Sequence, residues 1–448
     1  MPVQIMRVKR KCLELLARIE QEGAYSHLVL QQVAQSQELT AEEYPVLLQI
    51  VRGTLEQTGV LEDQLDGLLP KGLRSLPTDV QLVLRLSAYQ ILFLERVKKR
   101  DVVFEAVELV KTGRCRSFAG LVNAVLRKLE PMAGSTTGTQ VVSATRNFPT
   151  WLVERWQQQH GAEMIEHFCG AVGAVIPVYC RVNTSVVSRD ELRARLASEG
   201  VMTTAAVVSP SSLQVISVPS ALRITELESY KNGLFFIQDL SSTVVAEIVV
   251  SESPLRVRDL CAAPGGKACS MALSIGAHGG RVLATDKFPK RVALIQALCK
   301  RLLVNNLTAE VLDVGETGAA PEELFDAVLL DAPCSGSGTV GRKVDVRWSI
   351  TEERLRELIA LQLLLIKAAA RFVRSQGVLV YSTCSIDQDE NERIVEAFLQ
   401  SRSDFERVDL RDSLPPDICT DEGYLRTWPQ THAMTGAFAA KLRKRGET

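Results

Sequence analysis

Two cysteines follow two strongly apolar segments, and their placement is the first sign of chemistry in this sequence. The apolar run at residues 325–330 leads into Asp331-Ala332-Pro333-Cys334, and the run at residues 377–381 leads into Ser382-Thr383-Cys384-Ser385. Short apolar runs bounded by Gly, Ser and Pro are typical of buried parallel strands. Because the carboxyl ends of such strands meet at one edge of a sheet, we expect both thiols at the same ligand-binding edge. For either motif alone, a buried structural cysteine is the alternative.

A third loop carries the residues expected of a nucleoside cofactor site. It follows the apolar segment that ends at Asp259 and consists of Cys261, Ala262, Ala263, Pro264, Gly265, Gly266 and Lys267. Small residues after the first strand of an α/β sheet let a ligand approach the backbone closely. Asp286 ends the next expected strand, where a carboxylate can accept hydrogen bonds from a ribose diol. Asp313 ends the third, so these residues predict S-adenosylmethionine as the ligand.

Other uses of this loop fit less well. A phosphate-binding P-loop needs glycine where Cys261 stands and serine or threonine where Ala268 stands. A dinucleotide site needs the pattern G-x-G-x-x-G, which the loop lacks. For the loop taken alone, an ordinary tight turn between a strand and a helix is an alternative. Together with the acidic residues at two strand ends, an S-adenosylmethionine site is the better interpretation.

A thiol beside a sulfonium methyl donor suits methylation at C5 of cytosine. Addition of a thiolate to C6 makes C5 nucleophilic, and after methylation the C5 proton and the thiol leave, so that one difficult step becomes several easier ones. Only the thiolate reacts, and Lys267 is the cation expected to support it and the cofactor. We expect Asp331 to hold the cytosine edge and to contact the cofactor. The base must be unstacked or single-stranded to be reached.

The segments around these loops predict the fold that positions them. From about residue 236 to 448 strands and helices alternate, which indicates an α/β domain with a parallel sheet covered on both faces. The expected strands are residues 255–260, 281–286, 309–313, 326–330 and 377–382, and the expected helices include 290–303 and 352–373.

The sequence before residue 236 predicts further domains. Apolar residues recur at helical spacing through residues 1–130, which predicts an all-α bundle. A small, polar stretch at residues 131–144 predicts a linker. Residues 145–235 predict a small α+β segment with a strand at 175–182 and a helix that opens at the capping box of residues 188–191 and stops near Gly200.

Composition narrows the class of protein. The chain has 448 residues and a net charge of −1, so it is long enough for two or three domains but carries no bulk positive charge for nucleic acid. Its ten cysteines include no CxxC pair, which argues against a zinc site or a disulfide framework. The first residues lack a signal-peptide core and no apolar run reaches the roughly 20 residues of a membrane span. We therefore expect a cytoplasmic monomer without a metal.

With these motifs together, the chain resembles the RNA 5-methylcytosine methyltransferases of the RsmB/Sun (Fmu) family. Residues 259–267 match the first cofactor motif of that family, and residues 238–242 resemble the motif before it. Residues 331–336 match the fourth motif, and residues 382–385 match the sixth. The resemblance implies a Rossmann-like class I methyltransferase domain in which Cys384 is the nucleophile and Cys334 assists product release.

The resemblance also reaches the front of the chain. Residues 104–110 and 121–127 are similar to the NusB-type helical domain of these proteins. This combination implies an RNA-binding front domain and small-subunit (16S) ribosomal RNA as the substrate. Two stretches depart from the family pattern, namely residues 342–348 after the fourth motif and residues 435–440 near the C-terminus.

Three other functions fit the sequence less well. A methyltransferase acting on an exocyclic nitrogen typically has Asn/Asp-Pro-Pro-Tyr/Phe where this chain has a single proline followed by Cys334. An RNA-binding or antitermination protein with a non-catalytic methyltransferase fold would be favoured by loss of Asp259, Asp331 or Cys384, and all three are present. A hydrolase is disfavoured because five scattered histidines place no base beside a nucleophile elbow.

Overall fold

The computed structural model of the chain describes residues 2–36, 38–40, 42–131, 144–171, 176–219, 222–316 and 321–446. It divides the chain into two compact units, Met1–Ala174 with Arg342–Ser349, and Val175–Gly341 with Ile350–Thr448. Most of the predicted linker, residues 132–143, lies outside the described residues. The boundary between the units differs from the predicted domain boundary, because the helices of residues 144–171 pack with the helical bundle.

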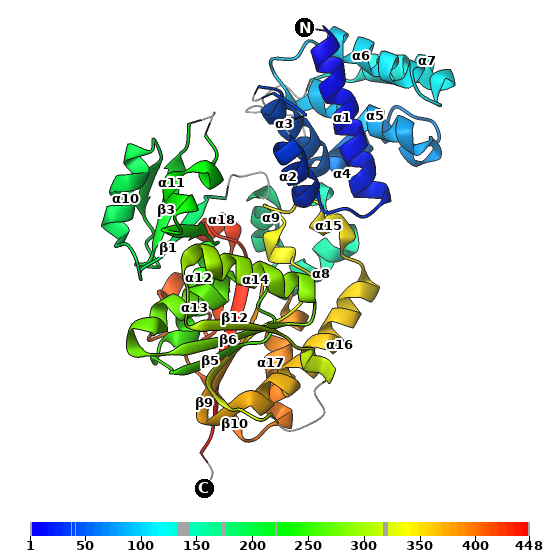
Figure 1. Cartoon of the computed structure of the whole chain (residues 1–448). Coiled ribbons are helices and arrows are strands. Elements are labelled where there is room, and N and C mark those ends of the chain that lie inside the picture. The colour runs from blue at the N-terminus through cyan, green and yellow to red at the C-terminus, as the bar shows by residue number, and fades with distance from the viewer. Residues whose placement is uncertain are drawn as a thin grey trace. The chain divides into compact units, whose positions relative to one another are not determined.

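The first unit is helical, as the periodicity of residues 1–130 predicts (Figure 1). At its centre is α5 (Thr78–Phe93), which is buried for most of its length and buries polar residues such as Arg85 and Gln90 together with its apolar ones. Residues of α5 contribute to two apolar clusters that involve different neighbours, so this one helix connects the two parts of the core of the bundle. The helices around it are α1 (Pro2–Gln21), α2 (Ser26–Ser36), α3 (Glu43–Glu56), α4 (Thr58–Asp66), α6 (Lys99–Lys111), α7 (Ala119–Lys128), α8 (Thr150–His160) and α9 (Ala162–Ala171).

The departing stretch at residues 342–348 belongs to this helical unit. Its short helix α15 (Val346–Ser349) carries Arg347, which is fully buried and donates to the backbone carbonyls of Val344, Glu56 and Asn147. The Arg347 guanidinium also lies 4.8 Å from the centre of the Phe148 ring. Burial lowers the pKa of Arg347 to about 10. Arg347 therefore anchors residues 342–349 in the helical unit, although the sequence analysis placed them in the domain of residues 236–448.

The second unit begins with a four-stranded antiparallel sheet in the order β2-β3-β1-β4. Its strands are β1 (Tyr179–Val182), β2 (Met202–Ala205), β3 (Ser212–Ser217) and β4 (Phe235–Ile237), with helices α10 (Arg189–Ser198) and α11 (Glu228–Lys231). The predicted capping box is present, since Ser188 accepts from the Glu191 N–H while the Glu191 side chain accepts from the Ser188 N–H. Gly200 has φ +85°, a left-handed conformation that stops the chain from continuing as helix.

The large sheet of this unit has the strand order β10-β12-β9-β8-β5-β6-β7 (Figure 1). The five predicted strands are all present, as β5 (Arg256–Asp259), β6 (Arg281–Asp286), β7 (Leu307–Val311), β8 (Phe325–Asp331) and β9 (Val373–Thr383), and they are parallel to one another. Helices α12 (Leu240–Val250), α13 (Gly266–Ile275) and α14 (Pro289–Leu302) share one apolar core with the sheet, and α16 (Glu352–Ala369) and α17 (Glu392–Ser401) share the other.

The large sheet also contains antiparallel strands in addition to the five predicted parallel ones. Strand β12 (Ala437–Lys444) lies antiparallel between β9 and β10 (Phe405–Val408), and β11 (Leu425–Thr427) pairs antiparallel with β12. No helix long enough for a crossover separates β11 from β12; only the four-residue α18 (Pro429–His432) lies between them, so the chain reverses direction there. The sheet is therefore mixed, with its antiparallel strands beside β9.

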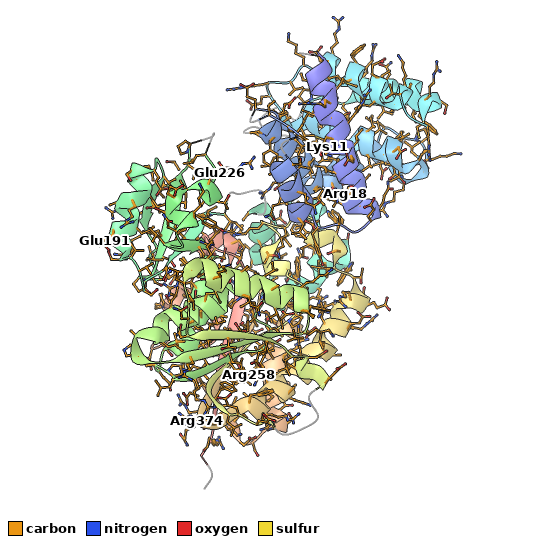
Figure 2. All side chains as sticks on the ribbon, viewed as in Figure 1. Lys11, Arg18, Glu191, Glu226, Arg258 and Arg374 are labelled. Atoms are coloured by element: carbon orange, nitrogen blue, oxygen red, sulfur yellow. The ribbon has the colours of Figure 1, made fainter. Side chains whose placement is uncertain are left out.

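Contacts of two arginines, Arg258 and Arg374, connect the amino ends of the central strands (Figure 2). The Arg258 guanidinium of β5 lies 4.2 Å from the Phe372 ring centre and 5.3 Å from that of Phe325. Arg374 of β9 forms an ion pair with Asp326 of β8, and Asp326 also accepts from the backbone N–H groups of Leu255 and Arg256. These contacts fix the strands at the end opposite the cysteine loops. In the described part of the chain, none of the helices combines the length and apolar character needed to cross a bilayer.

Candidate active site

The residues predicted to do chemistry lie in a row along one edge of the large sheet. Strand order places the loops in the sequence β9, β8, β5, β6, β7. Cys384 follows β9, Asp331 ends β8, the loop of residues 261–266 follows β5, Asp286 ends β6, and Asp313 follows β7. This is the carboxyl edge, where open α/β sheets bind ligands. The thiols therefore stand at one end of the row and the two predicted nucleoside-binding carboxylates at the other.

The two cysteines are in direct contact. Their Sγ atoms lie 3.3 Å apart, and both side chains are half-buried. Backbone hydrogen bonds hold the two loops together, from Ala332 N–H to the Ser382 carbonyl at 2.8 Å and from Gly338 N–H to the Cys384 carbonyl at 2.9 Å. The hydrogen bond with Cys384, together with burial, raises the pKa of Cys334 well above its usual value. Cys334 is therefore held as the protonated partner of the pair.

Lys267 and Asp331 form an ion pair beside the thiols. The Lys267 Nζ lies 2.7 Å from Asp331 Oδ2, and the Ser382 hydroxyl donates to Asp331 Oδ1 at 2.8 Å. Burial acts to lower the pKa of Lys267, but the charge and hydrogen bond of Asp331, with a further electrostatic contribution from Cys384, outweigh it, and the pKa is raised. Lys267 therefore stays cationic and interacts with both Asp331 and Cys384. Asp331 is therefore oriented by two donors, Lys267 in the first turn of α13 and Ser382 in β9.

The other end of the row fits an adenosine moiety. The buried Asp286 carboxylate accepts from the Phe288 N–H at 3.1 Å and lies 3.4 Å from Arg291, while Asp313 pairs with Lys287 at 3.1 Å. In the loop between them and the thiols, Gly265 has φ +105°, and a Cβ there would lie 3.1 Å from the Cα of Ile295. The backbone at Gly265 therefore packs closely against α14, and a larger side chain would not fit there. The small residues of this loop also let a ligand approach its backbone closely.

The Asp259 carboxylate lies behind this loop and is fully buried. Neither of its oxygens has a hydrogen-bond partner in the described part of the chain. Burial, and then repulsion by Asp331, raises the pKa of Asp259 to about 8, although Lys267 acts in the opposite direction. An anionic Asp259 is therefore costly to the free protein and would be favoured by a bound cationic group.

This predicts a pH-dependent stability that Asp259→Asn removes. Because the folded state raises the pKa of Asp259 above its ordinary value of 3.8, protonation stabilises the fold fully below about pH 4, and this contribution is lost as the pH rises to about 8. We expect the melting temperature of the wild-type protein, without cofactor, to fall more between pH 5.5 and 8.5 than that of Asp259→Asn. Parallel curves for the two proteins, recorded by differential scanning calorimetry, would contradict the assignment.

Glu390 joins the two cysteine loops and was not identified from the sequence. Its buried carboxylate accepts hydrogen bonds from the Ser335 N–H at 2.8 Å, from the hydroxyls of Ser335 and Ser385 at 2.5 Å each, and from Gln362 Nε2 at 3.0 Å. Ser335 follows Cys334 and Ser385 follows Cys384, so one carboxylate fixes the neighbours of both thiols. In the sequence Glu390 lies in the polar run of residues 387–392, which reads as a solvated surface.

We expect Glu390→Gln to slow catalysis without weakening substrate binding. Glutamine matches glutamate in shape, but its amide nitrogen cannot accept the hydrogen bonds that the second carboxylate oxygen accepts, so the thiols lose their fixed spacing. The expected result is a kcat lower by roughly 10- to 100-fold with KM for RNA within about twofold. Glu396→Gln on the exposed face of α17 is the matched control and should leave both constants unchanged. A change in KM alone would assign Glu390 to RNA binding instead.

The C-terminal stretch that departs from the family pattern supports the Cys384 loop. Gly436 N–H donates to the Gly338 carbonyl at 2.9 Å, and Gly338 N–H in turn donates to Cys384. A Cβ on Gly338 would lie 2.1 Å from the Gly436 carbonyl oxygen, so the two glycines are in backbone contact. Thr435 donates to Asp239, which ties residues 435–440 to the stretch at residues 238–242. Although residues 435–440 depart from the family pattern, their backbone still supports the loop that carries Cys384.

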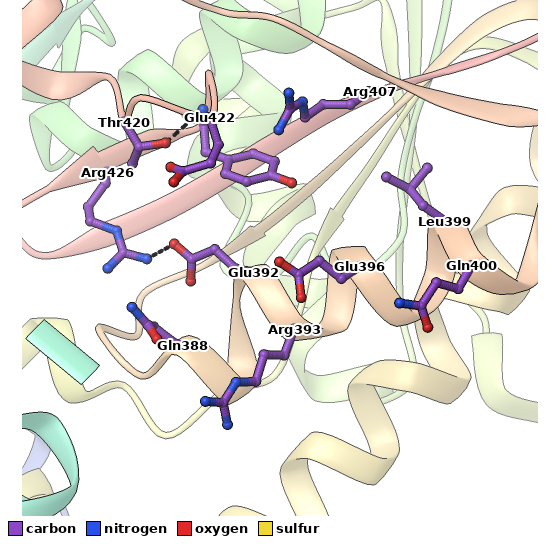
Figure 3. Close-up of a pocket in the computed structure, with 11 residues that line it drawn as sticks. Gln388, Glu392, Arg393, Glu396, Leu399, Gln400, Arg407, Thr420, Glu422 and Arg426 are labelled. Carbon is purple, nitrogen blue, oxygen red and sulfur yellow. Dashed lines mark hydrogen bonds and ion pairs between the residues drawn. The ribbon is translucent and has the colours of Figure 1, made fainter. Parts of the chain in front are cut away.

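A separate hollow of about 730 Å³ lies beside α17, β10 and β11, away from the strand ends that carry the thiols (Figure 3). It is lined by Gln388, Glu392, Arg393, Glu396, Leu399, Gln400, Arg407, Thr420, Glu422, Tyr424 and Arg426. Its three carboxylates and three guanidinium groups balance, and Glu392 and Arg426 form an ion pair. The hollow thus offers no excess charge to a ligand.

Three protein-family models match successive regions of the chain. The model of the 16S rRNA methyltransferase RsmB/F family matches residues 250–443, the NusB family model matches residues 6–131, and the ferredoxin-like domain model of RsmF/B-like methyltransferases matches residues 148–220. The probable ribosomal RNA small subunit methyltransferase B of Bacillus subtilis is 33% identical over 98% of this chain and 99% of its own length.

Further relatives and solved structures agree. Ribosomal RNA small subunit methyltransferase B of Photorhabdus laumondii is 30% identical over 91% of this chain and 92% of its own length. The crystal structure of PH0851 superposes with a TM-score of 0.80 and 25% identity, covering 99% of both chains. A methyltransferase homologue from Pyrococcus horikoshii gives a TM-score of 0.57 with 28% identity, over 66% of this chain and 95% of its own.

The cofactor is S-adenosylmethionine. This identification rests on the family and on the residues at the strand ends, which suit a nucleoside ligand. The motifs, the fold and near full-length similarity all agree, and the chain belongs to the RsmB/F family of 16S rRNA methyltransferases, with a NusB-family helical region, a ferredoxin-like segment and a Rossmann-like methyltransferase domain.

Proposed function

We propose that this protein methylates C5 of a cytosine in small-subunit ribosomal RNA through a covalent adduct between Cys384 and C6 of the base. The observation that carries the proposal is the pair of thiols 3.3 Å apart, one of them held protonated, beside the Lys267–Asp331 pair. Methylation of an amine or a hydroxyl needs no thiol pair, whereas addition to a pyrimidine ring needs a nucleophile and a way to release it. The substrate class is taken from the relatives named above.

The proposed reaction begins with attack on the ring. The Cys384 thiolate adds to C6, and the electron pair of the C5–C6 double bond moves into the ring toward N3 and O2. Asp331, held by Lys267 and Ser382, accepts from the N4 amino group, and the Lys267 ammonium stabilises the charge that the ring gains. C5 would then form a bond to the methyl group of S-adenosylmethionine as the S–CH3 bond breaks, with S-adenosylhomocysteine as the leaving group.

The second half of the reaction restores the aromatic ring. The C5 proton leaves to water, its electron pair re-forms the C5–C6 double bond, and the C6–S bond breaks with Cys384 leaving as the thiolate. The Cys334 S–H lies 3.3 Å from that sulfur and can donate a hydrogen bond to it as negative charge develops. The roles of the two thiols are therefore distinct although they share one contact.

The test is to identify the product. Full-length protein is incubated with methyl-labelled S-adenosylmethionine and an unmodified small-subunit rRNA transcript, and the RNA is digested to nucleosides. We expect label in 5-methylcytidine. Label in any other nucleoside would overturn the thiol chemistry, and absence of label from a protein that binds both cofactor and RNA would favour the non-catalytic RNA-binding alternative.

A further inference from the structure

A groove on the helical unit has the chemistry of a binding site, and it lies on the two helices that contain residues 104–110 and 121–127. It has a volume of about 520 Å³, runs along α6 and α7, and is lined by Lys99, Arg100, Val103, Phe104, Val107, Glu108, Lys111, Asn123 and Arg127. Along α6 the lining residues recur at helical spacing from residue 100 to residue 111, a length of about 16 Å. The groove therefore follows one helix face.

The charge of this groove is strongly positive. Four cationic side chains line it against the single carboxylate of Glu108, although the whole chain has a net charge of −1. Lys111 pairs with Glu108 at 2.8 Å and Lys99 pairs with Glu130 at 3.0 Å, and both pairs are exposed to solvent. Exposed pairs of this kind are weak and are readily exchanged for phosphate. Among the residues that the structure describes, Arg100 and Arg127 make no ion pair.

An aromatic ring lies within this positive groove. Phe104 is 65% exposed, whereas its neighbour on the same helix, Val103, is buried in the bundle core. A single exposed apolar side chain is common on proteins, but an exposed ring flanked by cations is the combination that binds unpaired bases. Asn123 on α7 adds an amide that can both donate to and accept from a base edge.

We propose that this α6–α7 groove binds a single-stranded segment of the RNA substrate, with a base stacked on Phe104 and phosphates held by Arg100, Lys111 and Arg127. Double-stranded RNA offers phosphates but no free base face, so the ring selects unpaired nucleotides. This proposal rests on the proposed RNA substrate. It names the surface of the helical unit that binds the RNA and the single-stranded form in which the RNA is bound.

The experiment uses the full chain and an unmodified small-subunit rRNA transcript, with Kd measured by filter binding over a range of salt concentrations. Phe104→Leu keeps an apolar side chain but removes the stacking face, and we expect Kd to rise about tenfold. Phe104→Tyr keeps that face and should retain wild-type affinity. The double variant Arg100→Gln/Arg127→Gln should weaken binding and reduce the salt dependence by about two phosphate contacts.

Arg74→Gln is the matched control, because Arg74 belongs to the same unit and its side chain is 85% exposed but lies outside the groove. It should leave Kd unchanged. All the substituted side chains are exposed, and equal melting temperatures would verify that the variants fold. Unchanged Kd and salt dependence in the groove variants would overturn the proposal and leave a protein partner as the occupant.

A second measurement separates this inference from the proposed reaction. A transcript carrying photoreactive 5-iodouridine should cross-link to the peptide that contains Phe104, and the cross-link should not depend on Cys384. If the wild-type protein forms 5-methylcytidine while groove variants bind RNA normally, only the groove proposal fails. If the cross-link maps to Phe104 but no 5-methylcytidine forms, the groove proposal stands and the proposed reaction fails.

Discussion

Cys384→Ala is expected to abolish methyl transfer to RNA, by at least about a thousandfold in kcat, while leaving S-adenosylmethionine binding within about twofold. The reason is that C5 of cytosine becomes nucleophilic only after a thiolate has added to C6, and in the proposed reaction Cys384, whose Sγ lies 3.3 Å from that of Cys334, makes that addition. The cofactor loop lies after β5, two strands away from β9, so loss of one sulfur leaves it intact. Transfer is measured as labelled 5-methylcytidine, and cofactor binding by calorimetry.

The control for Cys384→Ala is Cys419→Ala. Cys419 is half-buried, as Cys384 is, and it belongs to none of the motifs of the site. It should retain wild-type activity. If Cys384→Ala retained more than a few per cent of wild-type activity, the covalent route through this residue would be excluded. A loss of cofactor binding in the same variant would instead indicate that the substitution disturbs the sheet edge.

Cys334→Ala is expected to accumulate a covalent complex between protein and RNA. Addition by Cys384 and methylation at C5 do not need the second thiol, but release loses the S–H that stabilises the departing sulfur at 3.3 Å. The complex should appear as a slowly migrating band on a denaturing gel after incubation with the unmodified transcript and S-adenosylmethionine. Turnover should fall to roughly one methyl group per protein molecule, because each molecule is consumed by its own adduct.

The double variant Cys334→Ala/Cys384→Ala supplies the control for this adduct. It should give no slow band, since the sulfur that bonds to C6 is missing. A band that persists in the double variant would show attachment through another residue. A single variant that turns over normally and shows no band would exclude the release role of Cys334, while leaving Cys384 as nucleophile untouched.

Several features of this protein follow from short-range pattern alone. The five parallel strands lie within a few residues of the predicted segments, because an apolar run bounded by Gly, Pro and Asp is a local signal. The capping box at Ser188 is formed by residues three apart, and the structure has it. Since parallel strands end at one edge, the meeting of Cys334, Cys384 and Asp331 also followed from sequence.

Other features depend on contacts between residues far apart in the chain. Glu390 acts on Ser335 across 55 positions, and nothing in its polar neighbours distinguishes a buried carboxylate with four donors from a solvated one. Arg347 anchors its stretch in the helical unit through carbonyls of Glu56 and Asn147. Strand β12 returns antiparallel beside β9, which no alternation of strands and helices indicates.

Residue type and strand direction are local properties, so the kinds of groups at the site and the sheet edge on which they meet could be predicted from the sequence. Which carboxylate contacts both cysteine loops, and which unit contains residues 342–349, became known from the folded chain. Burial, hydrogen-bond partners and local charge set pKa values and geometry, and they come from elements that folding brings together.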